Sequence, residues 1–153
     1  MSKLKNNLKK GKYITVPIKL TATDHLEIKA KINGVKGVFI LDTGASNTCV
    51  GFDKQTHFKL TSKASKIKAA GAGAIGMETH ISSKNRIKIG KWKNKKIKII
   101  LFDLTHVNQA LEAHNVTQVD GIIGADILKQ TKAIIDYDKK RIYLSTRKIK
   151  NRF

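Results

Sequence analysis

Asp42 is the residue with the clearest potential for chemistry, because it directly follows four apolar residues, 38–41. That apolar run is typical of a buried strand, so the sequence places a carboxyl group at the end of the strand. A buried carboxylate is unfavourable unless it is hydrogen-bonded or neutralised, and its position therefore has a structural or a catalytic reason. The residues that follow it are Thr43, Gly44, Ala45 and Ser46. We interpret Asp42 as the candidate catalytic residue.

Two other segments are marked by glycine. Residues 121–124 have the sequence Gly-Ile-Ile-Gly, and residues 69–76 have the sequence Ala-Ala-Gly-Ala-Gly-Ala-Ile-Gly. The second segment contains the GxGxxG pattern of dinucleotide sites, but that motif needs a preceding strand, a following helix and an acid about 20 residues later. Lysine-rich residues 91–98 occupy that later place, so we reject a dinucleotide site. A flexible surface loop is the remaining structural alternative for residues 69–76.

The elements that must position these residues are mostly strands. Alternation of apolar and polar residues predicts half-buried strands at residues 13–20 and 26–32. Pro17 cannot donate to a ladder, so it places the first strand at a sheet edge. Asn33 and Gly34 form a strong signal for a type I′ hairpin, after which residues 35–41 return as a strand that ends at Asp42.

The rest of the chain continues this pattern with little helix. Residues 87–89 and 97–102 are predicted strands that flank a turn at residues 90–96. Residues 133–137 and 142–144 are predicted to form a final hairpin. Helix is expected only near residues 107–114 and 126–132, where Asp126 is expected to cap the first turn.

In this order of parts the chain resembles the retropepsin-like aspartic proteases, over roughly residues 13–145. In that family an apolar strand ending in Asp-Thr-Gly-Ala lies beside a later strand of two apolar residues and glycine. The resemblance implies a mostly β, single-lobe subunit of closed, barrel-like form, with a flap hairpin and one short C-terminal helix. The run of Gly124, Ala125 and Asp126 is similar to the cellular and bacterial branch of the family.

The resemblance also implies roles for individual residues. Asp42 would be catalytic, Thr43 would support the catalytic loop across a dimer, and Gly44 would present its backbone to the substrate. Residues 69–76 would be the flap that folds over a peptide. The implied substrate-binding positions are Gly44, Ala45, Ser46, Gly71, Ala72 and Gly73. The implied structural partner strand consists of Ile122, Ile123 and Gly124.

Peptide hydrolysis by carboxylates needs two of them, one ionised to take a proton from water and one protonated to polarise the scissile carbonyl. This chain offers a single Asp-Thr-Gly triplet, so we expect a homodimer in which two copies of Asp42 meet on the two-fold axis. A peptide or protein is the expected substrate, and no metal or other cofactor is expected. The alternative with the same fold is a catalytically silent module that binds extended peptides.

Composition limits the other possibilities. The chain has 153 residues, which suits one domain, and its 41% hydrophobic content is enough for a core. A single cysteine excludes an internal disulfide framework and suits a reducing compartment. We find no apolar run of transmembrane length and no secretory signal pattern, so a cytoplasmic location is expected.

The charge is strongly positive, at +20 from 31 Lys plus Arg and 11 Asp plus Glu. We predict a basic arm at residues 1–12, a protease-like domain at 13–146 and a basic tail at 147–153. Such a surface attracts phosphate backbones, and a basic nucleic-acid-binding protein is therefore the third hypothesis. It is not favoured, because aromatic residues are not interleaved with the lysines, which suggests a solvated outer face.

A few other residues have chemical potential of their own. Cys49 with His57 would be a nucleophile and base, but a lone cysteine is more often a small buried hydrophobe. The five histidines show no metal-ligand spacing and are interpreted as scattered surface residues. Asp120, just before the second apolar segment, is the acid to mutate as a control for Asp42.

Overall fold

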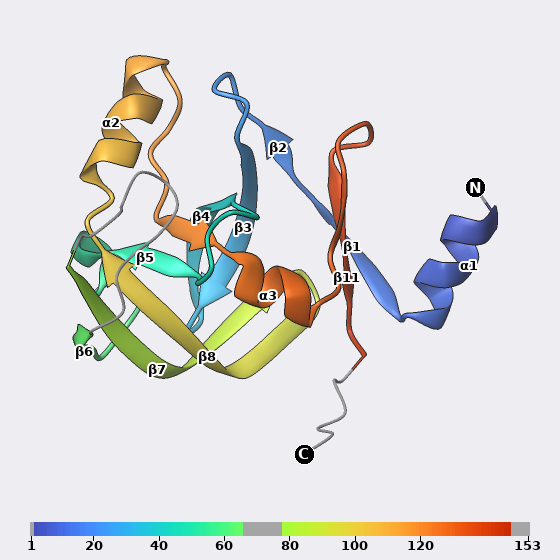
Figure 1. Ribbon diagram of the computed structural model, residues 1–153, viewed down its shortest axis with the longest axis horizontal. Helices are drawn as coiled ribbons and strands as arrows, with labels where there is room; N and C mark the ends of the chain where they lie inside the picture. Colours follow the sequence, from blue (N-terminus) through green and yellow to red (C-terminus); the bar gives the residue numbers. More distant parts are fainter. Residues whose placement is uncertain (1, 66–77, 148–153) are drawn as a thin grey trace.

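A computed structural model describes residues 2–65 and 78–147 (Figure 1). The helical elements are α1 (Ser2–Lys10), η1 (Phe52–Lys54), α2 (Thr105–Ala113) and α3 (Ala125–Gln130). The strands are β1 (Tyr13–Pro17), β2 (Lys19–Leu20), β3 (Leu26–Ile32), β4 (Val35–Leu41), β5 (Cys49–Gly51), β6 (Lys63–Ser65), β7 (Thr79–Ile89), β8 (Trp92–Phe102), β9 (Gly121–Ile123), β10 (Ile134–Asp136) and β11 (Arg141–Ser145).

Six of these strands close into a barrel. The larger sheet has the order β2-β3-β4-β9-β5-β8-β7-β6, and β3 also pairs with β7. The ring β3-β4-β9-β5-β8-β7 is therefore continuous, which confirms the expected closed, mostly β subunit. Two of its pairs are parallel, β4 with β9 and β5 with β8. A separate small sheet of order β1-β11-β10 joins the two ends of the described chain.

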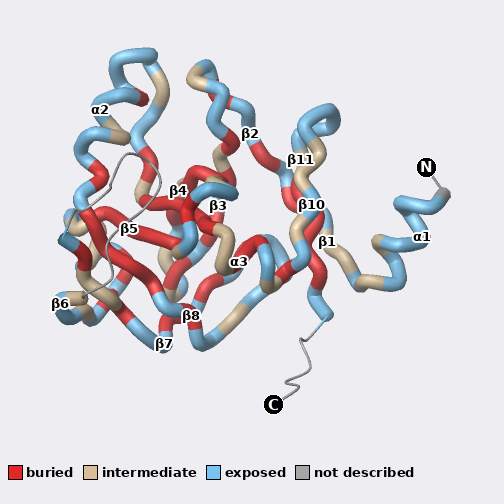
Figure 2. The backbone as a smooth tube through the Cα atoms, in the orientation of Figure 1, coloured by how far each residue is buried: buried red, intermediate tan, exposed pale blue. Residues whose placement is uncertain are grey.

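The barrel core follows from alternation along the strands. In β3 the residues Leu26, Ile28, Ala30 and Ile32 are buried, whereas Lys29 and Lys31 are exposed. Burying a leucine or isoleucine side chain stabilises the fold by about 1.5–3 kcal/mol. A one-residue slip in register would expose all of these side chains and would therefore be very unfavourable. Figure 2 shows the resulting contrast between the buried barrel strands and the exposed helix α1.

Several expected elements are confirmed. The β3–β4 hairpin turns at Asn33 and Gly34, whose φ angles of 51° and 82° are the positive values that a type I′ turn needs. Strand β4 has the predicted bounds, β1 lies at the edge of its sheet, and β10 pairs with β11 as the final hairpin. Helices α2 and α3 occupy the two predicted places within one or two residues.

Other expectations were wrong. Residues 90–96 were predicted to form a turn, but the turn has only two residues, because β7 ends at Ile89 and β8 begins at Trp92. Most lysines of this segment lie instead on β8, where they are exposed on the outside of a long hairpin. The predicted strand at 13–20 is interrupted at Ile18, whose amide donates to the carbonyl of Lys140 instead of a ladder partner. Helix α1 was not expected. It lies beyond the small sheet, away from the barrel (Figure 1).

The division into an arm, a domain and a tail stays a prediction, with β1 beginning at Tyr13 and β11 ending at Ser145. Among the described residues, no helix has the length and apolar character needed to cross a membrane.

Candidate active site

Asp42 lies where β4 ends, directly beside β9. The two strands run parallel, with Ile40 opposite Ile122 and Leu41 opposite Ile123. The amide of Asp42 extends this ladder by donating to the carbonyl of Ile123 at 3.0 Å. The apolar strand before Asp42 and the Ile-Ile-Gly strand therefore position the backbone of Asp42 together, and its side chain is half-buried.

A tight loop after Asp42 orients its carboxylate. The amide of Gly44 donates to Oδ1 of Asp42 at 2.8 Å, and the amide of Ala45 donates to the Asp42 carbonyl at 3.2 Å. A Cβ atom on Gly44 would be 3.2 Å from Oδ1, so a side chain at this position would crowd the carboxylate. Thr43, Gly44 and Ser46 are exposed, whereas Ala45 is buried.

The backbone at Gly124 and Ala125 packs closely against this loop. The amide of Ala125 donates to the carbonyl of Ala45 at 2.7 Å, and a Cβ atom on Gly124 would come within 2.8 Å of the Ala45 carbonyl. Only a glycine leaves room for this approach of backbone to backbone.

Thr48 and Asp126 form a second link between the loop that follows Asp42 and α3. The carboxylate of Asp126 accepts from the Thr48 amide at 3.0 Å and from the Thr48 hydroxyl at 2.8 Å. The Thr48 hydroxyl oxygen in turn accepts from the amide of Gly124 at 3.1 Å. Thr48 is fully buried, so these bonds satisfy polar groups that would otherwise destabilise the fold.

The expectation that Asp126 caps its own helix was wrong. The N-cap of α3 is Gly124, without a side-chain cap hydrogen bond. Asp126 lies two positions beyond this N-cap, and its carboxylate accepts from the Thr48 amide and hydroxyl and, at 2.9 Å, from the Ile127 amide. Sequence patterns alone do not distinguish these two uses of an acid near the start of a helix.

A cavity of about 610 Å³ opens beside Asp42. Its apolar wall includes Ile40, Leu111 and Ile122. The polar residues around it are Thr23, Asp24, His25, Asp42, His106 and His114. The histidines were interpreted as scattered surface residues. These three are exposed as expected, but they are not scattered, because they come together here from the turn before β3, from α2 and from the residue after α2. The helical spacing of His106, Ala110 and His114 was a signal that could have indicated a shared face.

Two of these histidines have defined partners. Nδ1 of His25 is 2.7 Å from the hydroxyl of Thr23, and Nδ1 of His114 is 3.2 Å from the carbonyl of Ala110. The cavity thus combines an apolar floor with an oriented polar rim. Its volume is sufficient for one large side chain of a bound molecule.

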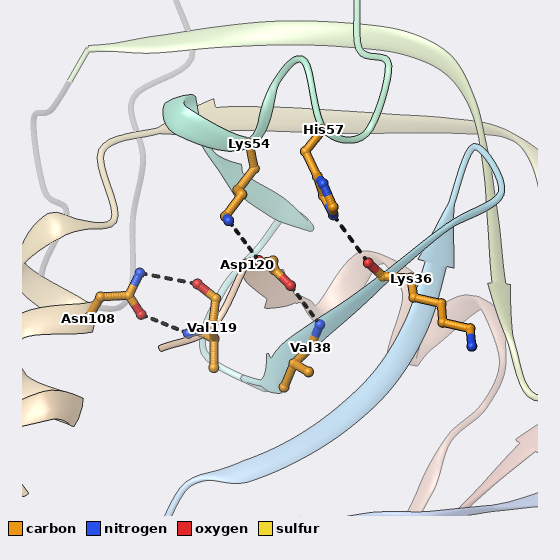
Figure 3. A network of polar contacts seen from close by, with 7 residues as sticks. All are labelled: Lys36, Val38, Lys54, His57, Asn108, Val119 and Asp120. Carbon is orange, nitrogen blue, oxygen red and sulfur yellow. Dashed lines mark hydrogen bonds and ion pairs between the residues drawn. The ribbon is translucent and has the colours of Figure 1, made fainter. Parts of the chain in front are cut away.

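Asp120 is occupied by structural contacts (Figure 3). Its Oδ2 accepts from the amide of Val38 at 2.9 Å, and its Oδ1 is 3.5 Å from Nζ of Lys54. Beside it, Asn108 of α2 exchanges two hydrogen bonds with the backbone of Val119, at 2.8 and 3.1 Å. These contacts tie β4 and α2 to the chain entering β9, which suits Asp120 as a control position.

Cys49 and His57 have different partners. The thiol of Cys49 is buried and donates to the carbonyl of Asn47 at 3.0 Å. The ring of His57 lies against Phe58, with Nε2 3.3 Å from the carbonyl of Lys36. Burial, with smaller contributions from the negative charges of Asp126 and Asp42, raises the pKa of the Cys49 thiol to about 12. The thiol therefore stays neutral at physiological pH and is a poor nucleophile.

We expect Cys49 in the folded chain to react with iodoacetamide about a thousandfold more slowly at pH 8 than it does in urea. The reason is that only the thiolate reacts, and each unit of raised pKa lowers the thiolate fraction about tenfold. Mass spectrometry of timed samples measures the two rates. Equal rates in the folded and unfolded chain would contradict the burial of this thiol.

The remaining predicted site residues, Gly71, Ala72 and Gly73, lie outside the described residues. In residues 2–65 and 78–147, no group of three or more His, Cys, Asp or Glu side chains is arranged to hold a metal ion.

Comparisons with known proteins give a family and a fold. A family profile described as aspartyl protease matches residues 28–127. The fold is similar to a retropepsin-like aspartic protease from Rickettsia conorii, with a TM-score of 0.61 and 21% identity over 86% of this chain and 90% of that one. It is also similar to the EIAV protease complexed with the inhibitor HBY-793, with a TM-score of 0.52 and 19% identity over 72% and 91% of the two chains. A sequence search of curated proteins found no match.

Proposed function

Because the chain belongs to the aspartyl protease family, and has the retropepsin-like fold, we propose that it is an endopeptidase that works as a homodimer through Asp42 of each subunit. The observation that carries the proposal is the position of Asp42. It is held at the end of β4 by the Ile123 carbonyl and the Gly44 amide, at the mouth of a cavity large enough for a substrate side chain.

The proposed reaction needs both carboxylates. One ionised Asp42 takes a proton from a bound water, while the protonated Asp42 of the second subunit donates a hydrogen bond to the scissile carbonyl. The water oxygen forms a bond to the carbonyl carbon and gives a tetrahedral diol. The C–N bond then breaks as the amine nitrogen receives a proton, and the products are a carboxylic acid and an amine. No covalent enzyme intermediate forms.

The substrate is proposed to bind as an extended strand. Its backbone would pair with the exposed backbone at Gly44 and with the flap at Gly71, Ala72 and Gly73, in the manner of an added β-strand. One side chain beside the scissile bond would enter the histidine-rimmed cavity. Thr43 would stabilise the pair of catalytic loops across the dimer axis.

Digestion of a peptide library by the full chain, with cleaved bonds identified by mass spectrometry, tests the proposal. Cleavage at defined bonds supports it. The absence of cleavage, together with sedimentation showing only monomer at the same concentration, would instead favour the catalytically silent peptide-binding module.

We expect Asp42→Asn chains to inhibit wild-type chains by forming mixed dimers. If each active unit needs two intact carboxylates, a ninefold excess of the variant leaves about one tenth of the wild-type activity after subunit exchange, because most wild-type chains then have an inactive partner. The peptide cleaved in the library assay provides the measurement. Unchanged activity at full exchange, verified with differently labelled subunits, would exclude a shared site.

A further inference from the structure

Four lysines form an unbroken row across four neighbouring strands, on the outer face of the barrel. Lys36 of β4 lies opposite Lys31 of β3, Lys31 lies opposite Lys88 of β7, and Lys88 lies opposite Lys93 of β8. All four are exposed. Since adjacent strands are about 4.8 Å apart, the row is about 14 Å long.

Without a bound anion, this row of like charges destabilises the fold. Like charges directly opposite one another on paired strands are destabilising. Of the two ion pairs among the described residues, one involves Lys54 and the other His80, so neither neutralises the row. Asp120, the acid at the edge of the adjoining hollow, offers little relief, because its carboxylate is already held by Lys54 and the Val38 amide.

Hollows flank the row on both sides and add more positive charge. One hollow, of about 550 Å³, lies between Lys29, Lys36 and Lys88, and Asp120 is the single acid at its edge. The other, of about 250 Å³, is lined by Arg86, Lys93 and Lys95 without an acid. Lys31 and Lys88 line both hollows, so the row and its flanks form one basic surface, which we call the lysine row.

We propose that the lysine row binds the phosphate backbone of duplex nucleic acid without regard to base sequence. A duplex carries closely spaced phosphates on both strands, so four lysines within about 14 Å can each lie near a phosphate. Lysine ammonium groups act as point charges toward phosphate and do not select bases. The charge pattern of the sequence alone favoured a solvated face, whereas the strand register brings these lysines into one line.

The surroundings favour a duplex over other anionic partners. The exposed large hydrophobic side chains of the described residues are Leu4, Leu20, Ile134 and Tyr137, and none of them lines either hollow. The row thus has no side chain to insert into a membrane and no aromatic ring for stacking unpaired bases. It is also remote from the proposed catalytic centre, because Lys36 and Asp42 are six residues apart on an extended strand, roughly 20 Å.

The experiment measures binding of a labelled 20-base-pair DNA duplex of mixed sequence by fluorescence anisotropy, from 50 to 300 mM NaCl. The test variant changes Lys31, Lys36, Lys88 and Lys93 to Gln. Its matched control changes the exposed residues Lys98, Lys129, Lys132 and Lys139 to Gln, and so has the same net charge. We expect the test variant to bind at least a hundredfold more weakly at 100 mM NaCl, with a salt slope lower by about 3.5, and the control to lose less than about threefold.

Each other outcome overturns the proposal. Equal losses in both variants would mean that the overall charge, and not the row, attracts the duplex. Binding of poly-glutamate or of anionic lipid vesicles as tight as binding of the duplex would assign the row to another partner. No binding by wild type at 50 mM NaCl would reject it directly.

Two further measurements keep the result separate from folding and from peptide cleavage. Removing the opposed charges is expected to raise the melting temperature of the test variant, so weaker binding would not reflect unfolding. The Asp42→Asn chain should bind the duplex as wild type does. Binding therefore tests the lysine row even if the chain cleaves no peptide.

Discussion

Replacing Asp42 with Asn is expected to lower peptide cleavage at least about a thousandfold while the fold is retained. An amide cannot take a proton from water at neutral pH, and in a homodimer the substitution removes both carboxylates at once. The change is isosteric, and Asn Oδ1 can still accept from the Gly44 amide that now bonds to Asp42 at 2.8 Å. The rates of cleavage of a library-derived peptide by the two proteins measure the effect, and thermal unfolding verifies the fold.

Asp120→Asn is the matched control for this experiment. Asp120 also lies beside β9, but its carboxylate is used by the Val38 amide and Lys54, so cleavage should change less than about threefold. The amide oxygen of Asn can keep the bond to Val38. Equal cleavage rates for wild type and Asp42→Asn would contradict a catalytic role of Asp42. Equal losses of cleavage in Asp42→Asn and Asp120→Asn would indicate a general effect of acids near β9.

The parts of the fold that could be predicted are those determined by local sequence. Asn33 and Gly34 predicted the β3–β4 hairpin because few other residues adopt two successive positive φ angles, and both angles are positive in the structure. The run before Asp42 predicted β4 with its correct bounds because four apolar residues in a row are suited to a strand in the barrel interior.

The parts that could not be predicted depend on which distant elements meet. The link between Thr48 and Asp126 joins the loop before β5 to α3, and no local pattern distinguishes it from a helix cap. The histidines around the cavity come from two segments that are neighbours only in the folded chain. The lysine row likewise depends on the register of three strand pairs, since the sequence shows only separate alternating runs.

Gly124→Ala is expected to destabilise the protein by about 1–3 kcal/mol and to reduce cleavage in the molecules that remain folded. The backbone of Gly124 has φ −99° and ψ −174°, an extended conformation open to any residue, so the objection to alanine is space alone. An added Cβ would lie 2.7 Å from the Asn47 carbonyl and 2.8 Å from the Ala45 carbonyl. Both contacts are backbone atoms of the loop that follows Asp42, and this loop must shift to make room. Chemical denaturation and cleavage rates below the melting temperature measure the two effects.

Gly51→Ala shows whether the effect of Gly124→Ala depends on crowding of the loop that follows Asp42. Gly51 is also buried and extended, with φ −65° and ψ 146°, and its added Cβ would lie equally close to a neighbour, 2.7 Å from Oδ1 of Asp53. That neighbour is the end of an exposed side chain that can rotate away, so stability should change by less than about 1 kcal/mol and cleavage should not change. A similar loss of stability and cleavage in both variants would mean that an added methyl group at any crowded position of the barrel has this effect. A loss of stability and cleavage in Gly124→Ala alone would indicate that the position of Asp42 depends on β9 and the residue after it.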